Sequence, residues 1–179
     1  MLAEEKGPPV TTQAAPEIRL LTPAEAAIYR DIRLEGLQQS PEAFSATFER
    51  ESVMPLAWFE ERLTKGNVFG AFMSGELLGV AGYWRQEGAK VGHKATLWGM
   101  YVRPAGRNAG LGRRLIEAIV DHASGRVELL QLSVASGNDA ARRLYEKMGF
   151  SEYGREMMAL KQDGRYFDEI LMMRFLANG

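Results

Sequence analysis

The sequence has no cysteine, only two histidines and no hydrophobic run long enough to cross a membrane. Without cysteine, the chain cannot form a disulfide scaffold, a thiolate metal site or a cysteine nucleophile. His93 and His122 cannot build a histidine metal site by themselves, so no metal is implied. A formal net charge of −1 gives no sign of nucleic-acid binding, although it is compatible with a local basic site for a phosphate ligand.

The first 16 residues are rich in Pro, Ala and Thr and lack the apolar run of a signal peptide. We expect a flexible tail over 1–16 and a single globular domain over 17–177, which is long enough to bury its own core. With neither an export signal nor a membrane-spanning segment, the expected location is the cytoplasm, away from the membrane.

The most informative stretch is VRPAGRNAGLGRRLIEAIV, residues 102–120, in which a strand leads through a glycine-rich turn into an amphipathic helix. The preceding ATLWGMYV is rich in residues that favour a buried strand, and Pro104 ends it by withholding a backbone donor. After Leu111 the apolar residues recur at helical spacing. The turn therefore lies at a helix N-terminus, where unpaired N–H groups and the helix dipole favour an anion.

The spacing Arg107-x-x-Gly110-x-Gly112 is typical of a phosphate site in which glycines admit the ligand and Arg107 and Arg113 add charge. It lacks the Gly-Lys-Ser/Thr of a nucleotide triphosphate loop and the third glycine of a dinucleotide fingerprint. The alternative is that the glycines only permit a tight turn between a strand and a helix.

A second motif, NDAARRLYEKMGF, begins about thirty residues later, at 138–150. Asn138 is a good N-cap, and Gly149 closes the predicted helix. Asn138 and Tyr145 are two helical turns apart, so they point nearly the same way and can serve one long ligand. Taken alone, Asn138 reads as an ordinary cap and Tyr145 as an ordinary core aromatic.

Together the two motifs resemble those of the GNAT superfamily of acyl-CoA-dependent N-acetyltransferases. The resemblance covers 67–176, and it extends to the first third of the chain only through the order of elements. It implies an α/β (α+β) fold, in which a mixed, mostly antiparallel sheet of about seven strands has a central parallel pair and about four flanking helices.

The resemblance also implies a site for acetyl-CoA. The backbone of the glycine-rich turn would bind the pyrophosphate, the backbone of 100–102 would pair with the pantetheine arm, Asn138 would hydrogen-bond that arm, and Tyr145 would stand beside the sulfur. The implied coenzyme-binding residues are Met100, Tyr101, Val102, Arg107, Asn108, Ala109, Gly110, Leu111, Gly112, Arg113, Asn138 and Tyr145, with Tyr145 also catalytic. Asn108 replaces a glycine that is common in the family, and Asn tolerates left-handed backbone better than other non-Gly residues.

In the first half of the chain, EIRLLT at 17–22 reads as a strand, and Thr22-Pro23 begins a helix at 24–40. Two short helices, or a loop and a helix, are expected at 41–66, and a hairpin at 67–74 and 77–84. The predicted buried face of the first helix consists of Ala27, Ile28, Ile32 and Leu37.

In the second half, the strand at 127–136 is expected to lie parallel to the strand before the glycine-rich turn, because a helix connects the two. Asp163-Gly164 predicts a final hairpin of 150–160 and 165–176. The apolar segment ILMMRFL is expected either to be internal or to pair with another subunit, so a homodimer stays open.

The implied reaction is direct attack of a primary amine of a small molecule or peptide on acetyl-CoA. Tyr145 is expected to stabilise or protonate the leaving thiolate. No base is evident on the central strand. The alternatives are Glu35, Glu49 or a relay through water with backbone carbonyls or the Tyr101 hydroxyl. The aromatic and acidic residues of 42–61 would suit a cationic acceptor.

Two other functions remain open. One is a non-catalytic acyl-CoA-binding or sensing module, which the missing base would allow. The other is an acetyltransferase acting on aminoacyl-tRNA, which should show a basic stripe; the acidic residues between 42 and 61 argue against it.

Overall fold

Residues 15–176 are described by the computed structural model, so most of the predicted tail lies outside the described residues. One mixed sheet runs through this part of the chain in the order β1-β2-β3-β4-β5-β7-β6. Its strands are β1 (Glu17–Leu20), β2 (Asn67–Met73), β3 (Glu76–Arg85), β4 (Lys94–Val102), β5 (Leu129–Ala135), β6 (Ser151–Gln162) and β7 (Arg165–Phe175). All neighbours are antiparallel except β4 and β5, which confirms the predicted sheet.

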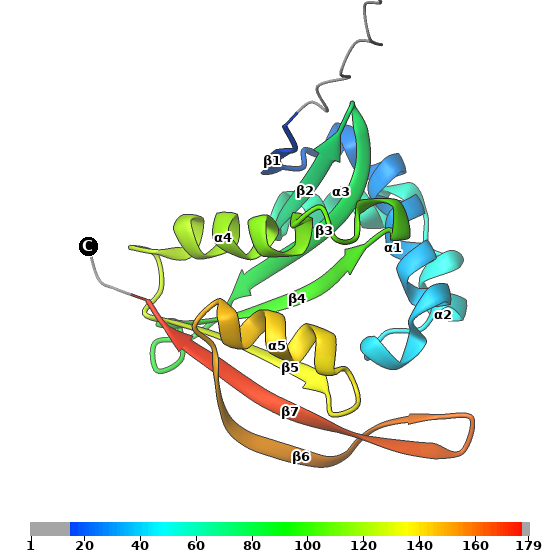
Figure 1. Ribbon diagram of the computed structural model, residues 1–179. Helices are drawn as coiled ribbons and strands as arrows, with labels where there is room; N and C mark the ends of the chain where they lie inside the picture. The colour runs from blue at the N-terminus through cyan, green and yellow to red at the C-terminus, as the bar shows by residue number, and fades with distance from the viewer. Residues whose placement is uncertain (1–14, 177–179) are drawn as a thin grey trace, which may run out of the picture.

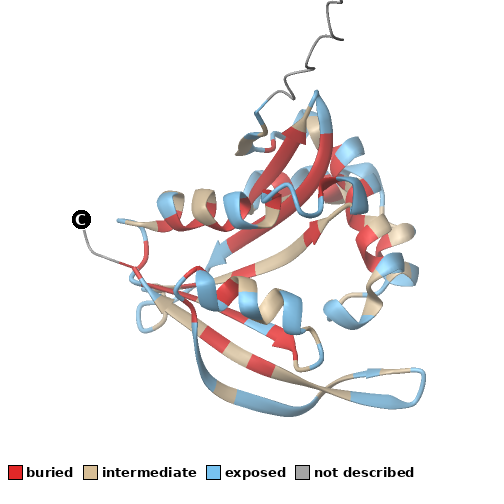
Figure 2. Cartoon of the chain, in the orientation of Figure 1, coloured by how far each residue is buried: buried red, intermediate tan, exposed pale blue. Residues whose placement is uncertain are grey.

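The sheet is covered on both faces (Figure 1). The helices are α1 (Ala26–Gln39), α2 (Phe48–Ser52), α3 (Leu56–Lys65), α4 (Leu111–Ala123) and α5 (Asp139–Lys147), with short 3-10 turns η1 (Pro23–Glu25), η2 (Pro41–Ala43) and η3 (Pro104–Gly106). Side chains of α4 and α5 share one core with the sheet, and those of α1 and α3 share the other. Figure 2 shows the resulting burial along the inner strands β2 and β3. None of the described helices is both long enough and apolar enough to cross a membrane.

The parallel pair is short. The β4–β5 ladder consists of Lys94–Leu129, Ala95–Leu130 and Thr96–Gln131, after which the two strands no longer pair (Figure 1). We call the unpaired stretches, 97–102 of β4 and 132–135 of β5, the wedge. On its other side β4 carries a bulge, since Gly99 and Met100 together oppose a single residue of β3 and Gly99 has a φ of +66°. Bulges of this kind bend a strand and increase its local twist.

Helix α1 forms as predicted, but its predicted buried face is partly wrong. Ala27 and Ile28 are exposed, the latter at 41%. The residues that face the sheet are Ala26, Tyr29, Ile32, Arg33, Gly36 and Leu37. They still follow helical spacing, but the stripe includes a buried arginine in place of two apolar side chains.

Gly36 lets α1 approach β4 closely. A Cβ at this position would lie 2.9 Å from the Tyr101 ring, which is too close for any side chain.

The final hairpin also forms as predicted. Asp163 and Gly164 have φ values of +49° and +78°, as expected for an Asp-Gly turn. Strand β7 lies between β5 and β6, so the apolar segment ILMMRFL is internal to the sheet. Strand β6 forms the edge, and most of its residues are exposed (Figure 2).

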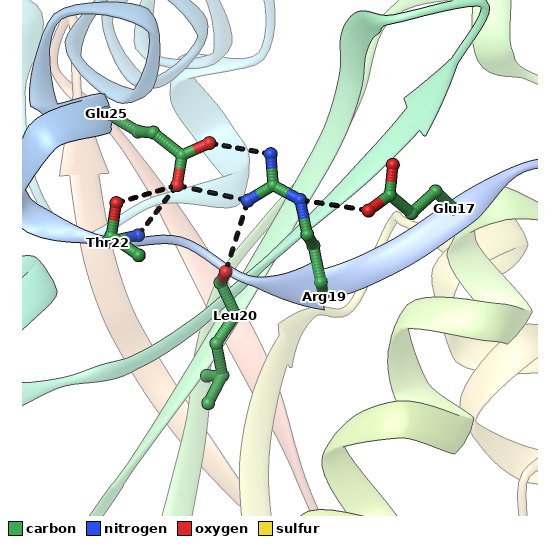
Figure 3. A network of polar contacts seen from close by, with 5 residues as sticks. All are labelled: Glu17, Arg19, Leu20, Thr22 and Glu25. Atoms are coloured by element: carbon green, nitrogen blue, oxygen red, sulfur yellow. Dashed lines mark hydrogen bonds and ion pairs between the residues drawn. The ribbon is translucent and has the colours of Figure 1, made fainter.

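A polar network fixes the start of α1 (Figure 3). Arg19 forms two hydrogen bonds to the carboxylate of Glu25, at 2.8 and 3.0 Å, and also pairs with Glu17 at 3.1 Å. The backbone and side chain of Thr22 donate to Glu25 at 2.8 and 3.0 Å. The Arg19 guanidinium outweighs partial burial and lowers the pKa of Glu25 to about 2.

Candidate active site

The glycine-rich turn adopts the left-handed backbone that its residues suggest. Asn108 has a φ of +63° and Gly110, the N-cap residue of α4, a φ of +73°. Asn is among the few non-Gly residues that accept this conformation readily, so the departure from the family pattern at 108 is tolerated. The turn is exposed from Arg107 to Gly110.

The turn offers a row of free backbone donors. The N–H of Arg114 bonds to the carbonyl of Gly110 and opens the helix. Within the described residues, the N–H groups of 108–113 donate to no backbone or side-chain acceptor. Arg107 donates from Nε to the Val102 carbonyl at 3.2 Å, and Arg113 pairs with Glu117 at 2.8 Å, both at the surface. Free N–H groups at the positive end of a helix favour a phosphate ligand.

Tyr145, Met100, Gly112 and Leu144 lie close together beside the wedge. The Tyr145 hydroxyl lies 3.4 Å from the sulfur of Met100. A Cβ built on Gly112 would lie 2.9 Å from the Met100 methyl group and 3.1 Å from a methyl group of Leu144. The first motif, β4 and the second motif therefore converge on one spot, on the α4 face of the sheet.

Tyr145 is a core residue as well as a candidate catalytic one. Its side chain is 6% exposed and its ring packs edge-on against Phe150, with centroids 5.8 Å apart. Burial raises the pKa of the Tyr145 hydroxyl well above its ordinary value of 10.0. The group is therefore a poor proton donor but a well-placed hydrogen-bond donor.

Asn138 confirms the predicted N-cap of α5. Its side-chain oxygen accepts the Ala141 N–H at 3.1 Å. An asparagine amide also carries two N–H donors, which this cap does not use. Asn138 is partly exposed at the end of β5, so these donors are available to a ligand in the wedge.

On the opposite face of β4, Tyr101 contacts one of the two carboxylates predicted as bases. Its hydroxyl donates to Glu35 at 3.1 Å, and Arg103 holds the other oxygen of Glu35 at 2.8 Å. Burial, followed by the hydrogen bond to Glu35, raises the pKa of Tyr101. Glu49 is exposed on α2, and among the described residues its carboxylate pairs with neither Tyr101 nor Arg103.

Sequence reasoning missed a buried charged group on this face. Arg33 of α1 and Glu51 of α2 form two hydrogen bonds of 2.9 Å, and Arg62 of α3 lies 3.7 Å from Glu51. Arg62 is stacked between the rings of Trp58 and Trp98, at 4.5 Å from each. We call Arg33, Glu51, Arg62 and Trp98 the cationic cluster. The available signal was the position of Arg33 on the same helical stripe as Tyr29 and Ile32.

The predicted aromatic and acidic lining at 42–61 takes a different form. Phe59 is fully buried in the core, and Glu51 faces arginines. The other acidic residues of the segment, Glu42, Glu49, Glu60 and Glu61, are exposed to solvent. Arg33, Glu51 and Arg62 meet on this face, and Trp58 and Glu61 help to line a cavity beside Arg62, so the lining carries charges of both signs.

Comparisons with known proteins bear on the family and the fold of the chain. The profile described as "Acetyltransferase (GNAT) family" matches residues 30–150. The chain is similar to an L-methionine sulfoximine/L-methionine sulfone acetyltransferase of Pseudomonas paraeruginosa, with 32% identity over 122 residues that cover 65% of this chain and 69% of that protein. It is also similar to the N-alpha-acetyltransferase RimI of Mycobacterium tuberculosis, with 33% identity over 119 residues, 65% of this chain and 73% of that protein.

Among solved structures, the chain resembles yncA of Salmonella typhimurium, whose structure includes its cofactor acetyl-CoA. The TM-score is 0.75 and the identity 22%, over 92% of this chain and 96% of that one. A likeness at this identity speaks for the fold.

Proposed function

This chain belongs to the GNAT family of acetyltransferases, and we propose that its wedge is the place where acetyl-CoA reacts, with Tyr145 at the sulfur. The chain is an acyltransferase that uses acetyl-CoA and acetylates an amine. The residue roles that follow are part of the proposal.

The coenzyme would lie on the α4 face. The free N–H groups of 108–113 suit its pyrophosphate, because they point away from the helix and need an acceptor. The unpaired stretch of β4, which includes Met100 and Val102, suits the amides of the pantetheine arm. The unused donors of Asn138 suit a carbonyl of the same arm.

The acceptor amine would enter from the α1 face. Its lone pair attacks the thioester carbonyl, the carbon–sulfur bond breaks, and the amine loses a proton to water or to a nearby base. Of the two predicted carboxylates, Glu35 is the one connected to β4, because it accepts a hydrogen bond from Tyr101. It is also paired with Arg103. The α-amino group of a peptide, with a pKa near 8, costs only about 1.4 kcal/mol to deprotonate at pH 7, so it needs less help from a base than a more basic amine does.

The leaving thiolate would be stabilised by Tyr145. Its hydroxyl already donates to a sulfur, that of Met100, at 3.4 Å. Because burial raises the pKa of Tyr145 further, full proton transfer to a thiolate is uphill, and a hydrogen bond to the developing charge is the more effective contribution. This contact between a buried tyrosine and a sulfur beside Gly112 is the observation that carries the proposal.

The acceptor is a primary amine of a small molecule or of a peptide. Two relatives support the two alternatives, since one is named for an amino-acid derivative and the other as an N-alpha-acetyltransferase. We further propose a cytoplasmic location, because acetyl-CoA is made and used there. Fractionation of the tagged protein in its host would test the location.

A thiol-release assay with acetyl-CoA tests the function. The panel contains amino acids, polyamines, aminoglycosides and N-terminal peptides, and calorimetry measures coenzyme binding in parallel. We expect release with one class of amine. Tight binding of the coenzyme without release from any amine would favour a sensing module, and the absence of binding would refute the site at the glycine-rich turn.

A further inference from the structure

The cationic cluster on the α1 face of the sheet carries more positive than negative charge. Arg33 is 5% exposed and Glu51 2% exposed, so their bidentate pair is removed from water. Arg62 shares the same carboxylate. Two guanidinium groups, which stay charged in proteins, therefore face one carboxylate, and the group retains a net positive charge.

The same cluster has more donors than acceptors. Three of its buried polar atoms have no hydrogen-bond partner among the described residues: Arg33 Nη1, Arg62 Nε and Trp98 Nε1. All three are donors. On the same face Arg30 Nε and the Tyr29 hydroxyl are also unpartnered, and of these only the hydroxyl can accept as well as donate. Buried donors without partners are uncommon and costly, and each calls for an explanation. A carboxylate ligand carries a negative charge and hydrogen-bond acceptors but no donors. It would neutralise the excess positive charge of the cluster and accept hydrogen bonds from its unpartnered donors.

The free end of Arg33 lies over the wedge. A Cβ built on Gly99 would be 3.6 Å from Arg33 Nη1, so this nitrogen lies against the β4 bulge. The α4 face, which carries Gly112 and Tyr145, is on the other side of the strand. In an α-amino acid the amine and the carboxylate share one carbon. A carboxylate held by Arg33 would therefore bring the amine into the wedge.

We propose that Arg33 anchors the carboxylate of the acceptor and that the acceptor is a free α-amino acid. This inference rests on the proposed function and narrows its acceptor. A peptide N-terminus carries a neutral amide in place of the carboxylate, and the amide cannot neutralise the cluster. Arg33 is thus a specificity-determining residue that discriminates amino acids from peptides.

One side chain covers the anchor. The Phe44 ring centroid lies 4.9 Å from the Arg33 guanidinium carbon, and Phe44 follows η2, which approaches β5 across the same face. Phe44 is half-buried and lies outside helices and strands. Its ring has to turn aside for a carboxylate to reach Nη1. A cavity of about 460 Å³ on this face has the volume of a small-molecule site. Its lining includes Glu61, Arg62, Lys65 and Trp98 but not Arg33, so it adjoins the anchor through Arg62.

The first test uses the wild-type protein. Acetyl transfer is measured with L-methionine sulfone, L-leucine, L-phenylalanine and L-glutamate, each beside its α-carboxamide and a dipeptide that begins with the same residue. We expect kcat/KM for the best free acid to exceed that for its amide by at least about 30-fold, because the neutral amide cannot form the charge-assisted hydrogen bond to Arg33 Nη1. Amides or dipeptides that react as well as the acid would overturn the inference while leaving the acetyltransferase function intact. The absence of thiol release from every compound would mean that the proposed function itself fails.

The second test removes the free donor and keeps the charge. Arg33→Lys retains a cation for Glu51 but lacks the second arm of the guanidinium. We expect the preference for acid over amide to fall below about fivefold, through a higher KM for the acid, with kcat and the amide kinetics little changed. Arg30→Lys is the matched control, since Arg30 lies one turn earlier on α1 and bonds to the Ser52 carbonyl, and it should keep the preference. A loss of activity that is equal for acid and amide would show that Arg33 has only a structural role.

Discussion

The Tyr145 hydroxyl donates a hydrogen bond to the Met100 sulfur at 3.4 Å, so a tyrosine from the second motif meets a thioether from the central strand. A thioether sulfur is a weak hydrogen-bond acceptor. In the proposed complex, the thioester sulfur of acetyl-CoA would lie close to the position of the Met100 sulfur. The side chain of Met100 therefore occupies space that the proposed pantetheine path needs. Because methionine is flexible, it can vacate this space at little cost.

Removal of the Tyr145 hydroxyl should slow turnover more than it weakens binding. In Tyr145→Phe we expect kcat to fall about 10- to 100-fold, since the developing thiolate loses a buried donor, while the Kd for acetyl-CoA changes less than about threefold. Steady-state kinetics and calorimetry measure the two quantities. Tyr166→Phe, at an exposed tyrosine on β7, serves as the control. An unchanged kcat in Tyr145→Phe would remove Tyr145 from the mechanism.

Gly112→Ala should affect the coenzyme more than the fold. Alanine in place of glycine favours a helix by about 1 kcal/mol, which offsets the crowding of two flexible methyl groups, so unfolding free energy should stay within about 1 kcal/mol of wild type. The new methyl group narrows the space beside Met100, and we expect the Kd for acetyl-CoA to rise about tenfold. Gly137→Ala is the control because a Cβ there meets no atom within 4 Å. Equal affinities in the two variants would contradict the assigned path.

Asn138 caps α5 and, in the proposed complex, donates to the coenzyme. The substitution Asn138→Asp should keep the first role and remove the second. Aspartate still accepts the Ala141 N–H, so the cap of α5 and the melting temperature should be preserved. The two amide donors are lost, and we expect KM for acetyl-CoA to rise about tenfold. Asn138→Ala, which also removes the cap, should in addition lose about 1 kcal/mol of stability. If the aspartate variant retains wild-type kinetics, Asn138 is only a cap.

The Arg19–Glu25 pair should contribute to stability in a defined pH range. Glu25 has a folded pKa of about 2 against an ordinary value of 4.5. The carboxylate is therefore stabilised by folding above pH 4.5, and this contribution is lost as the pH falls from 4.5 towards 2. We expect about 1 kcal/mol, less than the shift alone implies, because the Arg19 side chain is 40% exposed and water screens the pair.

Denaturation of Glu25→Gln from pH 7 to pH 2 measures this contribution. The variant should be less stable than wild type at pH 7 and converge with it near pH 2. Glu17→Gln removes the other, more exposed partner of Arg19 and should show a much smaller difference. Parallel curves for wild type and Glu25→Gln across this range would exclude a role for the pair.

Local sequence signals predicted the features that short-range chemistry determines. The turn at Asp163-Gly164 and the cap at Asn138 depend on their own backbone preferences, and both are confirmed. Asn108 tolerates left-handed backbone better than other non-Gly residues, and it adopts a positive φ. The mixed, mostly antiparallel sheet followed from the resemblance, and its central parallel pair from the helix between β4 and β5; both are confirmed.

The features that could not be predicted from the sequence depend on how segments that are far apart in the chain pack against one another. Arg33 and Glu51 are 18 positions apart on separate helices, so their pairing has no local signature. The ladder between β4 and β5 ends at Thr96 although both strands continue beyond it, and the bulge at Gly99 was not predicted. On α1, apolar character favoured Ile28, whereas the docked helix turns Arg33 towards the sheet.

The three-rung ladder between β4 and β5 also bears on the order in which the chain assembles. The antiparallel hairpins β2–β3 and β6–β7 begin with pairs only three positions apart, whereas Lys94 and Leu129 are 35 positions apart. Closing the longer loop costs more chain entropy, and only three residue pairs of the sheet offset that cost. We therefore expect this seam to form late in folding, with φ-values near zero at Ala95 and Leu130. The opening that the reaction requires would then also be the joint at which two early-formed halves of the molecule are brought together.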